Sequence, residues 1–291
     1  MVEIESTAKQ MNSPSYRQVL ELILAPEDPR GEDVPEGLGA IEVLPERLQF
    51  KGPSKDYLTV KLFKGVAEEP HILLFPGELD GPESLNYLAT GFGQFGFTFM
   101  AMEYAGGTGS LSELLEQARA LIDAVSMWKD AQGRTGPLVP MGRSLGCGIA
   151  LDAAGHLQDK VLALILESAF DRSEDFFRAM GLDNLAMDVQ EGADPFSNRE
   201  KMKSFKPPVL FLHSHIDDMV TIKQVEWLVA ESRSKASQFQ IIPSDSRKGI
   251  LRTGGSLYFS NIRDYLYLRM GKRPKYIPRR KRKGRNTKGI F

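Results

Sequence analysis

A serine between two glycines is the residue of this chain best placed to do chemistry. Gly142-Arg143-Ser144-Leu145-Gly146 fits the pattern Gly-x-Ser-x-Gly. An apolar segment precedes it at 138–141 and a helical one follows at 145–157, which is the setting of a nucleophile elbow. We expect the Ser144 hydroxyl at the C-terminal edge of a sheet, with the backbone N–H of Leu145 as an oxyanion donor beside a helix N-terminus. The alternative is a glycine-rich strand–helix turn without chemistry.

The elements that must position Ser144 are short apolar segments alternating with helical ones. Strands are expected at 57–63, 71–75, 97–102, 138–141, 161–166, 209–213 and 238–242, and helices at 83–95, 110–130, 144–157, 221–234 and 257–270. This alternation predicts an α/β fold with a mostly parallel central sheet and helices on both faces. We divide the chain into an N-terminal helix and linker (1–50), a domain (51–271) with a cap-like insertion (171–205), and a basic tail (272–291).

Several segments carry a resemblance to a known family. Residues 72–77 (ILLFPG), 141–150, 164–170 and 208–217 (PVLFLHSHID) follow one another in the order of an oxyanion loop, an elbow, the next strand and an acid-bearing strand. Over about 57–269 the chain resembles the α/β-hydrolase superfamily, in its branch of single-domain esterases, lysophospholipases and serine aminopeptidases. The resemblance implies the α/β-hydrolase fold with a small cap, and hydrolysis of a carboxylic ester or related acyl bond in a small substrate.

The same resemblance implies roles for other residues. Asp217 follows Ser144 by 73 positions and falls where relatives carry the acid that orients the base, with Asp218 as the competing choice. The second oxyanion N–H comes from the residue after Gly77, which is Glu78. A carboxylate there is unusual, since it disfavours a nearby oxyanion unless it points away.

The base is the residue that this chain lacks. In relatives a histidine follows the last core strand, and that position falls on Arg247, with no histidine after His215. An arginine stays protonated and has no acceptor, so it cannot take the proton from the serine. Arg247 could instead pair with Asp217. His215, two residues before Asp217, is the one candidate for a substitute base.

Two functions therefore stay open. The first is a serine hydrolase that acts on a small acyl substrate, and the second is a non-catalytic scaffold or binding protein, a pseudoenzyme. His71, His156 and His213 are expected to be structural or at the surface. The polar loop around Asp217 and Asp218 is not read as a metal site, so neither a metal nor a cofactor is expected.

Net charge hides a split between the body and the tail. The whole chain has a formal net charge of −1, but residues 272–291 hold ten basic residues and no acidic one, leaving 27 basic and 38 acidic residues elsewhere. A basic tail of this kind is either a solvated extension or an arm for RNA or another anionic partner, such as an acidic protein. The candidate contacts are Arg279, Arg280, Lys281, Arg282, Lys283 and Arg285.

The chain has a single cysteine, Cys147, and this bears on the cellular compartment that we expect. Cys147 excludes an intramolecular disulfide, which favours a cytoplasmic or other reducing intracellular location. Beside the elbow, Cys147 is expected to be a small buried hydrophobe. No apolar run approaches the ~20 residues of a membrane helix, and residues 1–10 do not resemble a secretory signal.

Overall fold

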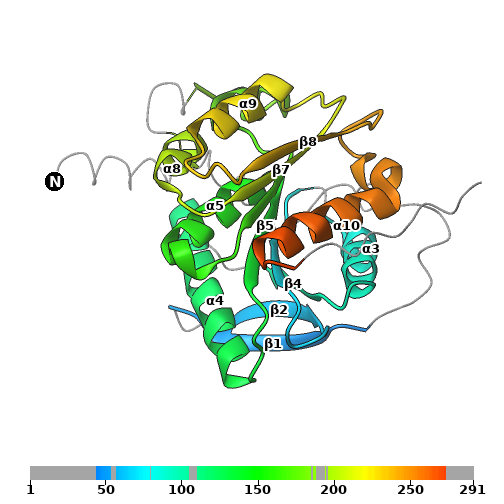
Figure 1. Ribbon diagram of the computed structural model, residues 1–291. Coiled ribbons are helices and arrows are strands. Elements are labelled where there is room, and N and C mark those ends of the chain that lie inside the picture. Colours follow the sequence, from blue (N-terminus) through cyan, green and yellow to red (C-terminus); the bar gives the residue numbers. More distant parts are fainter. Residues whose placement is uncertain are drawn as a thin grey trace, which may run out of the picture.

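An eight-stranded sheet forms the centre of the computed structural model (Figure 1), which describes residues 44–53, 57–78, 80–104, 110–184, 186–187, 194 and 196–272. The strands are β1 (Glu46–Lys51), β2 (Tyr57–Phe63), β3 (His71–Phe75), β4 (Thr98–Glu103), β5 (Leu138–Arg143), β6 (Leu164–Glu167), β7 (Val209–Ser214) and β8 (Gln238–Ile242). Their order is β1-β2-β4-β3-β5-β6-β7-β8. The pairs β1–β2 and β2–β4 are antiparallel and the remaining pairs are parallel.

Helices cover both faces of this sheet. They are α3 (Pro82–Gly93), α4 (Leu111–Ala131), α5 (Gly146–Leu157), α6 (Ser173–Ala179), α8 (Asn198–Ser204), α9 (Ile222–Glu231) and α10 (Ile250–Arg269), with a short 3-10 helix at Gln158–Lys160. In Figure 1, α3 and α10 lie on one side of the sheet and α4 and α5 on the other. Two separate apolar clusters match this layering, one containing residues of α4, α5 and α9 and one containing residues of α3 and α10.

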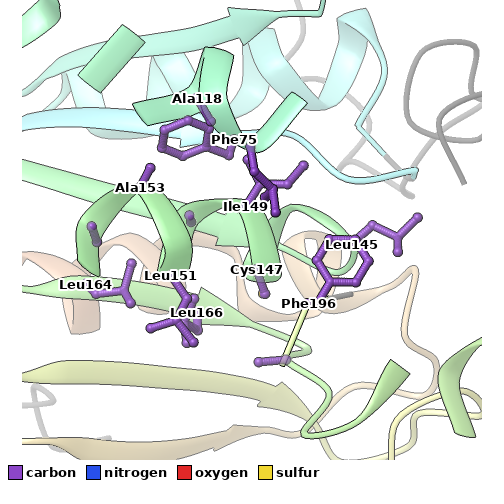
Figure 2. Close-up of a cluster of buried hydrophobic side chains, with 14 of the residues drawn as sticks. Phe75, Ala118, Leu145, Cys147, Ile149, Leu151, Ala153, Leu164, Leu166 and Phe196 are labelled. Carbon is purple, nitrogen blue, oxygen red and sulfur yellow. The ribbon is translucent and has the colours of Figure 1, made fainter. Parts of the chain in front are cut away.

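The central strands are buried because they have a helix layer on each side. Every residue of β3, β5, β6 and β7 is buried, as expected of parallel strands covered on both faces. Figure 2 shows apolar side chains of α5, including Ile149 and Leu151, gathered with Phe75, Ala118 and Leu166 in one cluster. Cys147 belongs to it and is 1% exposed, and burial raises the pKa of its thiol well above the usual value. The cysteine is therefore a packing residue and not a nucleophile.

The structure differs from the sequence-based division at the start of the sheet. Residues Glu46–Lys51, assigned to the linker, form β1 and pair with β2 along its whole length, so the sheet begins earlier than residue 51. Within 171–205, the expected cap-like insertion, the structure forms α6 and α8, and Phe196, which lies between them in the sequence, is buried. The expected N-terminal helix and the basic tail beyond Lys272 lie outside the described residues.

A buried histidine at the start of β3 makes the fold sensitive to acid. His71 is fully buried, and its Nε2 accepts a hydrogen bond from Arg134 Nε at 2.8 Å. Burial, together with the charges of Arg134 and Lys129, lowers the pKa of His71 from 6.5 to about 4. Between these values the unfolded chain binds a proton that the folded chain does not, so stability is lost as pH falls from 6.5.

We therefore predict that chemical denaturation shows a His71-dependent loss of stability on acidification. The slope is about 1.4 kcal/mol per pH unit once the pH is well below 6.5. Comparison with His71→Gln, which keeps an acceptor for Arg134, isolates this term from the titration of carboxylates. An unchanged difference in unfolding free energy between the two proteins from pH 7.5 to pH 5 contradicts the assignment.

Candidate active site

The elbow has the backbone that a strained strand–helix turn requires. Ser144 has φ of 51°, a left-handed conformation that is uncommon for a residue other than glycine. A Cβ on Gly146 would lie 2.0 Å from the carbonyl oxygen of Phe75, and a Cβ on Gly77 would lie 2.2 Å from that of Arg143. The two glycines thus allow the oxyanion loop and the elbow to pack backbone against backbone, with Ser144 held between them.

Asp217 lies on the loop after β7 and faces the elbow. Its Oδ1 accepts backbone hydrogen bonds from Met219 N at 3.0 Å and Val220 N at 2.8 Å, which fix the carboxylate. The Asp217 side chain is 1% exposed, whereas Asp218 is exposed and lines a cavity at the surface. Of the two aspartates, Asp217 is the one that the structure brings to Ser144 and Arg247.

Arg247 lies between Asp217 and Ser144, as the histidine of a triad does. Its Nε is 3.9 Å from Asp217 Oδ2, and its Nη2 donates to Ser144 Oγ. The Arg247 side chain is 5% exposed and its guanidinium lies 5.6 Å from the centre of the Phe176 ring of α6. The β8–α10 loop therefore presents a fixed cation to the serine instead of a base.

Glu78 points into the site, which corrects the expected oxyanion hole. Its Oε1 accepts a hydrogen bond from Ser144 Oγ at 2.7 Å, and its Oε2 accepts one from Leu145 N at 3.3 Å. The same Oε1 also accepts from Arg247 Nη2. The backbone donor that an oxyanion would need is thus already occupied by a carboxylate of the chain itself, because the positive charge of Arg247 favours an anion at this position.

The structure does not support His215 as a substitute base. His215 follows the last residue of β7, its side chain is exposed, and no contact of the described residues joins its ring to Ser144 or Asp217. Its backbone N–H donates to Ile242 O at 2.8 Å, which holds the residue in the connection beside β8.

His213, the second-last residue of β7, is fully buried, and its Nδ1 is 3.9 Å from Asp217 Oδ2. Burial lowers the pKa of His213 although Asp217 opposes this.

A second buried ion network under the elbow was not anticipated from the sequence. Arg143, between Gly142 and Ser144, donates to Asp80 Oδ1 through Nη1 and to Glu167 Oε1 at 2.8 Å through Nη2. Tyr258 of α10 donates to Glu167 Oε2 at 2.5 Å. The Arg143, Asp80 and Glu167 side chains are each at most 5% exposed. This network joins the oxyanion loop, the elbow, the end of β6 and α10.

Burial and ion pairing shift the pKa values of Asp80 and Arg143 in this network. Burial raises the pKa of Asp80 well above its usual value, although a hydrogen bond from Gly77 N at 2.8 Å acts against it. Burial on its own would lower the pKa of Arg143, but the neighbouring Glu167 carboxylate contributes to a net rise. Arg143 is therefore the cation that compensates Glu167, and the Asp80 contact to Gly77 fixes the turn that carries Glu78.

The hydroxyl of Ser144 and the backbone N–H of Leu145 both have partners within the chain. The serine proton already has an acceptor in Glu78, within the distance a general base requires. However, the same carboxylate also occupies Leu145 N–H, so a substrate carbonyl cannot take that place while Glu78 holds it. Arg247 donates to the oxygen that would attack and has no acceptor.

Two kinds of feature are absent from the part of the chain that the structure describes. Within those ranges, no group of three or more His, Cys, Asp and Glu side chains is arranged to hold a metal ion. Likewise, none of the described helices is both long and apolar enough to cross a membrane.

Fold and elbow together define a protein of the α/β-hydrolase fold, and comparisons with known proteins agree. Over 189 residues the chain is 26% identical to the alpha/beta hydrolase domain-containing protein WAV2 of Arabidopsis thaliana, a match that covers 60% of this chain. The chain spans about 58% of the length of that relative. No family model matches the chain.

Solved structures repeat the fold at low sequence identity. Est1E from Butyrivibrio proteoclasticus superposes with a TM-score of 0.63 at 14% identity, covering 78% of this chain and 99% of its own. Pyrococcus horikoshii acylaminoacyl peptidase superposes with a TM-score of 0.57 at 15% identity, covering 81% of this chain and 42% of its own. The resemblance to the α/β-hydrolase superfamily is thereby confirmed at the level of the fold.

Proposed function

We propose that this chain is a non-catalytic protein of the α/β-hydrolase fold, descended from serine hydrolases and used for binding. The observation that carries the proposal is the Glu78 carboxylate, which accepts hydrogen bonds from both Ser144 Oγ and Leu145 N while pairing with Arg247. One side chain occupies the oxyanion position and another the position of the base. The likeness to Est1E and to an acylaminoacyl peptidase, at 14–15% identity, supports the fold alone, and the proposed ancestry rests on the Gly-x-Ser-x-Gly elbow within that fold.

The competing function is a serine hydrolase in which Glu78 or another group serves as base. Such an enzyme needs a vacant oxyanion donor when the ester enters, so Glu78 Oε2 would have to leave Leu145 N–H while Oε1 stays on Ser144 Oγ. Arg247 also donates to both Glu78 Oε1 and Ser144 Oγ and has no acceptor of its own, so the non-catalytic function is favoured.

Ester hydrolysis by the purified protein tests the proposal. We predict that a panel of p-nitrophenyl esters of different acyl length is hydrolysed no faster by the wild-type chain than by Ser144→Ala. Arg119→Met, at an ion pair between α4 and α5, is the matched control for a change far from the elbow. A wild-type rate that exceeds background and disappears in Ser144→Ala overturns the proposal.

A second candidate function concerns the basic tail, and the ten basic residues of 272–291 favour it. Contacts between such a run and phosphates release counterions, so affinity falls steeply with salt. We predict that deletion of 273–291 abolishes binding to a single-stranded RNA oligonucleotide. We also predict that the full chain loses affinity with a log–log salt slope of about −0.7 per phosphate contact.

The matched control for that deletion keeps the length of the tail and replaces its basic run (279–283 and 285) with glutamine. Titration with polyglutamate distinguishes RNA from an acidic protein as the partner. RNA affinity that is unchanged by both variants rules the arm out. The proposed setting is a reducing intracellular compartment, in keeping with the single buried Cys147.

A further inference from the structure

The donors around Glu78 form a complete binding site for one carboxylate. Ser144 Oγ and Leu145 N belong to the elbow, and Arg247 belongs to the loop between β8 and α10. Glu78 comes from the loop after β3, so the carboxylate and its donors belong to different segments of the chain. Donors of three kinds, a hydroxyl, a backbone N–H and a guanidinium, thus converge on a single carboxylate.

The cation of this site has contacts besides its ion pair with Glu78. Arg247 is 5% exposed, its Nη1 donates to Met219 Sδ at 2.8 Å, and its guanidinium lies over the Phe176 ring. Its buried Nε has no hydrogen-bond partner, and Asp217 Oδ2 lies 3.9 Å from it. A buried guanidinium fixed by packing and left short of one acceptor is preorganised for an anion.

A cavity at the surface is lined in part by Arg247, while Glu78, Ser144 and Leu145 lie outside its lining. It has a volume of about 350 Å³, the size of a small organic molecule. Arg247 and Met219 line it together with Ile216, Asp218, Asp245, Ser246 and Lys248. Ile216 and Met219 offer apolar surface, and the acidic side chains Asp218 and Asp245 are balanced by the basic side chains Arg247 and Lys248. The lining therefore suits a carboxylate carried on an apolar body.

We propose that this site binds a small monocarboxylate, whose carboxylate replaces that of Glu78 on Ser144, Leu145 and Arg247. The inference rests on the proposed non-catalytic function, since a hydrolase would release such an acid. Glu78 is then a built-in competitor that occupies the site until the ligand arrives. Replacing histidine with arginine turns a position that transfers a proton into one that recognises the product of ester hydrolysis.

Thermal unfolding with acetate and hexanoate tests the inference. Glu78→Ala removes the atoms that acetate supplies, so we expect acetate to raise its Tm by about 2–4 °C at a concentration near five times Kd. Hexanoate is expected to raise the Tm of the wild-type chain as well, at higher concentration because Glu78 competes. Acetamide and chloride, which lack a carboxylate, are expected to have no such effect.

Two variants locate the binding. Glu78→Ala/Arg247→Met is expected to lose the shift with acetate, and Glu78→Ala/Arg119→Met is expected to keep it. The inference is overturned if Glu78→Ala shows no shift, if the shift survives loss of Arg247, or if hexanoate never shifts the wild-type chain. Any of these results without ester hydrolysis leaves the proposed function standing, whereas hydrolysis that depends on Ser144 overturns the proposed function itself.

Discussion

Replacing Glu78 with alanine and Arg247 with histidine in one chain is expected to create a reactive serine. The histidine would lie between Asp217 and Ser144, in the place of the Arg247 side chain. In the wild-type chain, Arg247 Nε lies 3.9 Å from Asp217 Oδ2 and Arg247 Nη2 donates to Ser144 Oγ. Loss of Glu78 frees Leu145 N–H for the oxyanion. One oxyanion donor contributes about 10²–10³ in kcat, and the triad histidine of a serine protease contributes about 10⁶.

We therefore expect the double variant to release p-nitrophenol from an activated ester in a burst at least about 10³-fold faster than the wild-type chain. Arg247→His alone is expected to stay inactive, because Glu78 still fills the oxyanion position. Adding Ser144→Ala to the double variant is the control and should remove the burst. Full activity from Arg247→His alone would show that Glu78 does not block the site.

Arg143→Met is expected to destabilise the fold strongly. It leaves Glu167 buried with its Tyr258 hydrogen bond but without its cation, and it removes the partner of Asp80. Removing one partner of a buried ion pair typically costs about 3–5 kcal/mol, because the remaining charge is uncompensated. The free energy of unfolding from urea denaturation measures the loss.

Arg47→Met provides the matched comparison. Arg47 pairs with Glu103 at 3.0 Å, but its side chain is 68% exposed, and a surface ion pair contributes less than about 1 kcal/mol. Equal losses in the two variants would contradict the role of Arg143 as the charge that holds the elbow, the oxyanion loop and α10 together.

Much of the fold is predictable from the sequence because its strands are buried on both faces. Continuous, mostly apolar segments such as His71–Phe75 and the start of Val209–Ser214 predict strands buried on both faces, because they alternate with amphipathic helices that can cover a sheet. β1 was missed because Glu46–Lys51 is an edge strand with three basic or acidic side chains and alternating exposure, which reads as a polar linker. Pairing with β2, not its own composition, makes it a strand.

Only the part of the site that depends on backbone geometry, the elbow at Ser144, is predictable from the sequence. The Gly-x-Ser-x-Gly spacing was enough to expect the elbow, whose φ of 51° at Ser144 the structure shows. The direction of the Glu78 side chain could not be foreseen, since it depends on an arginine 169 residues away. The ion pair between Arg143 and Glu167 is indicated by the sequence, because each charge lies inside an otherwise apolar or small-residue segment. Two such charges are stable in the interior only when they pair with one another.

Labelling of Ser144 by a fluorophosphonate probe tests the central claim most directly. The wild-type chain, shown to be folded by its cooperative unfolding, is compared with Ser144→Ala and with Glu78→Ala/Arg247→His. If Glu78 and Arg247 silence the serine, the wild-type chain is labelled no faster than Ser144→Ala, and the double variant is labelled stoichiometrically. Stoichiometric labelling of the folded wild-type chain that Ser144→Ala abolishes would contradict the account.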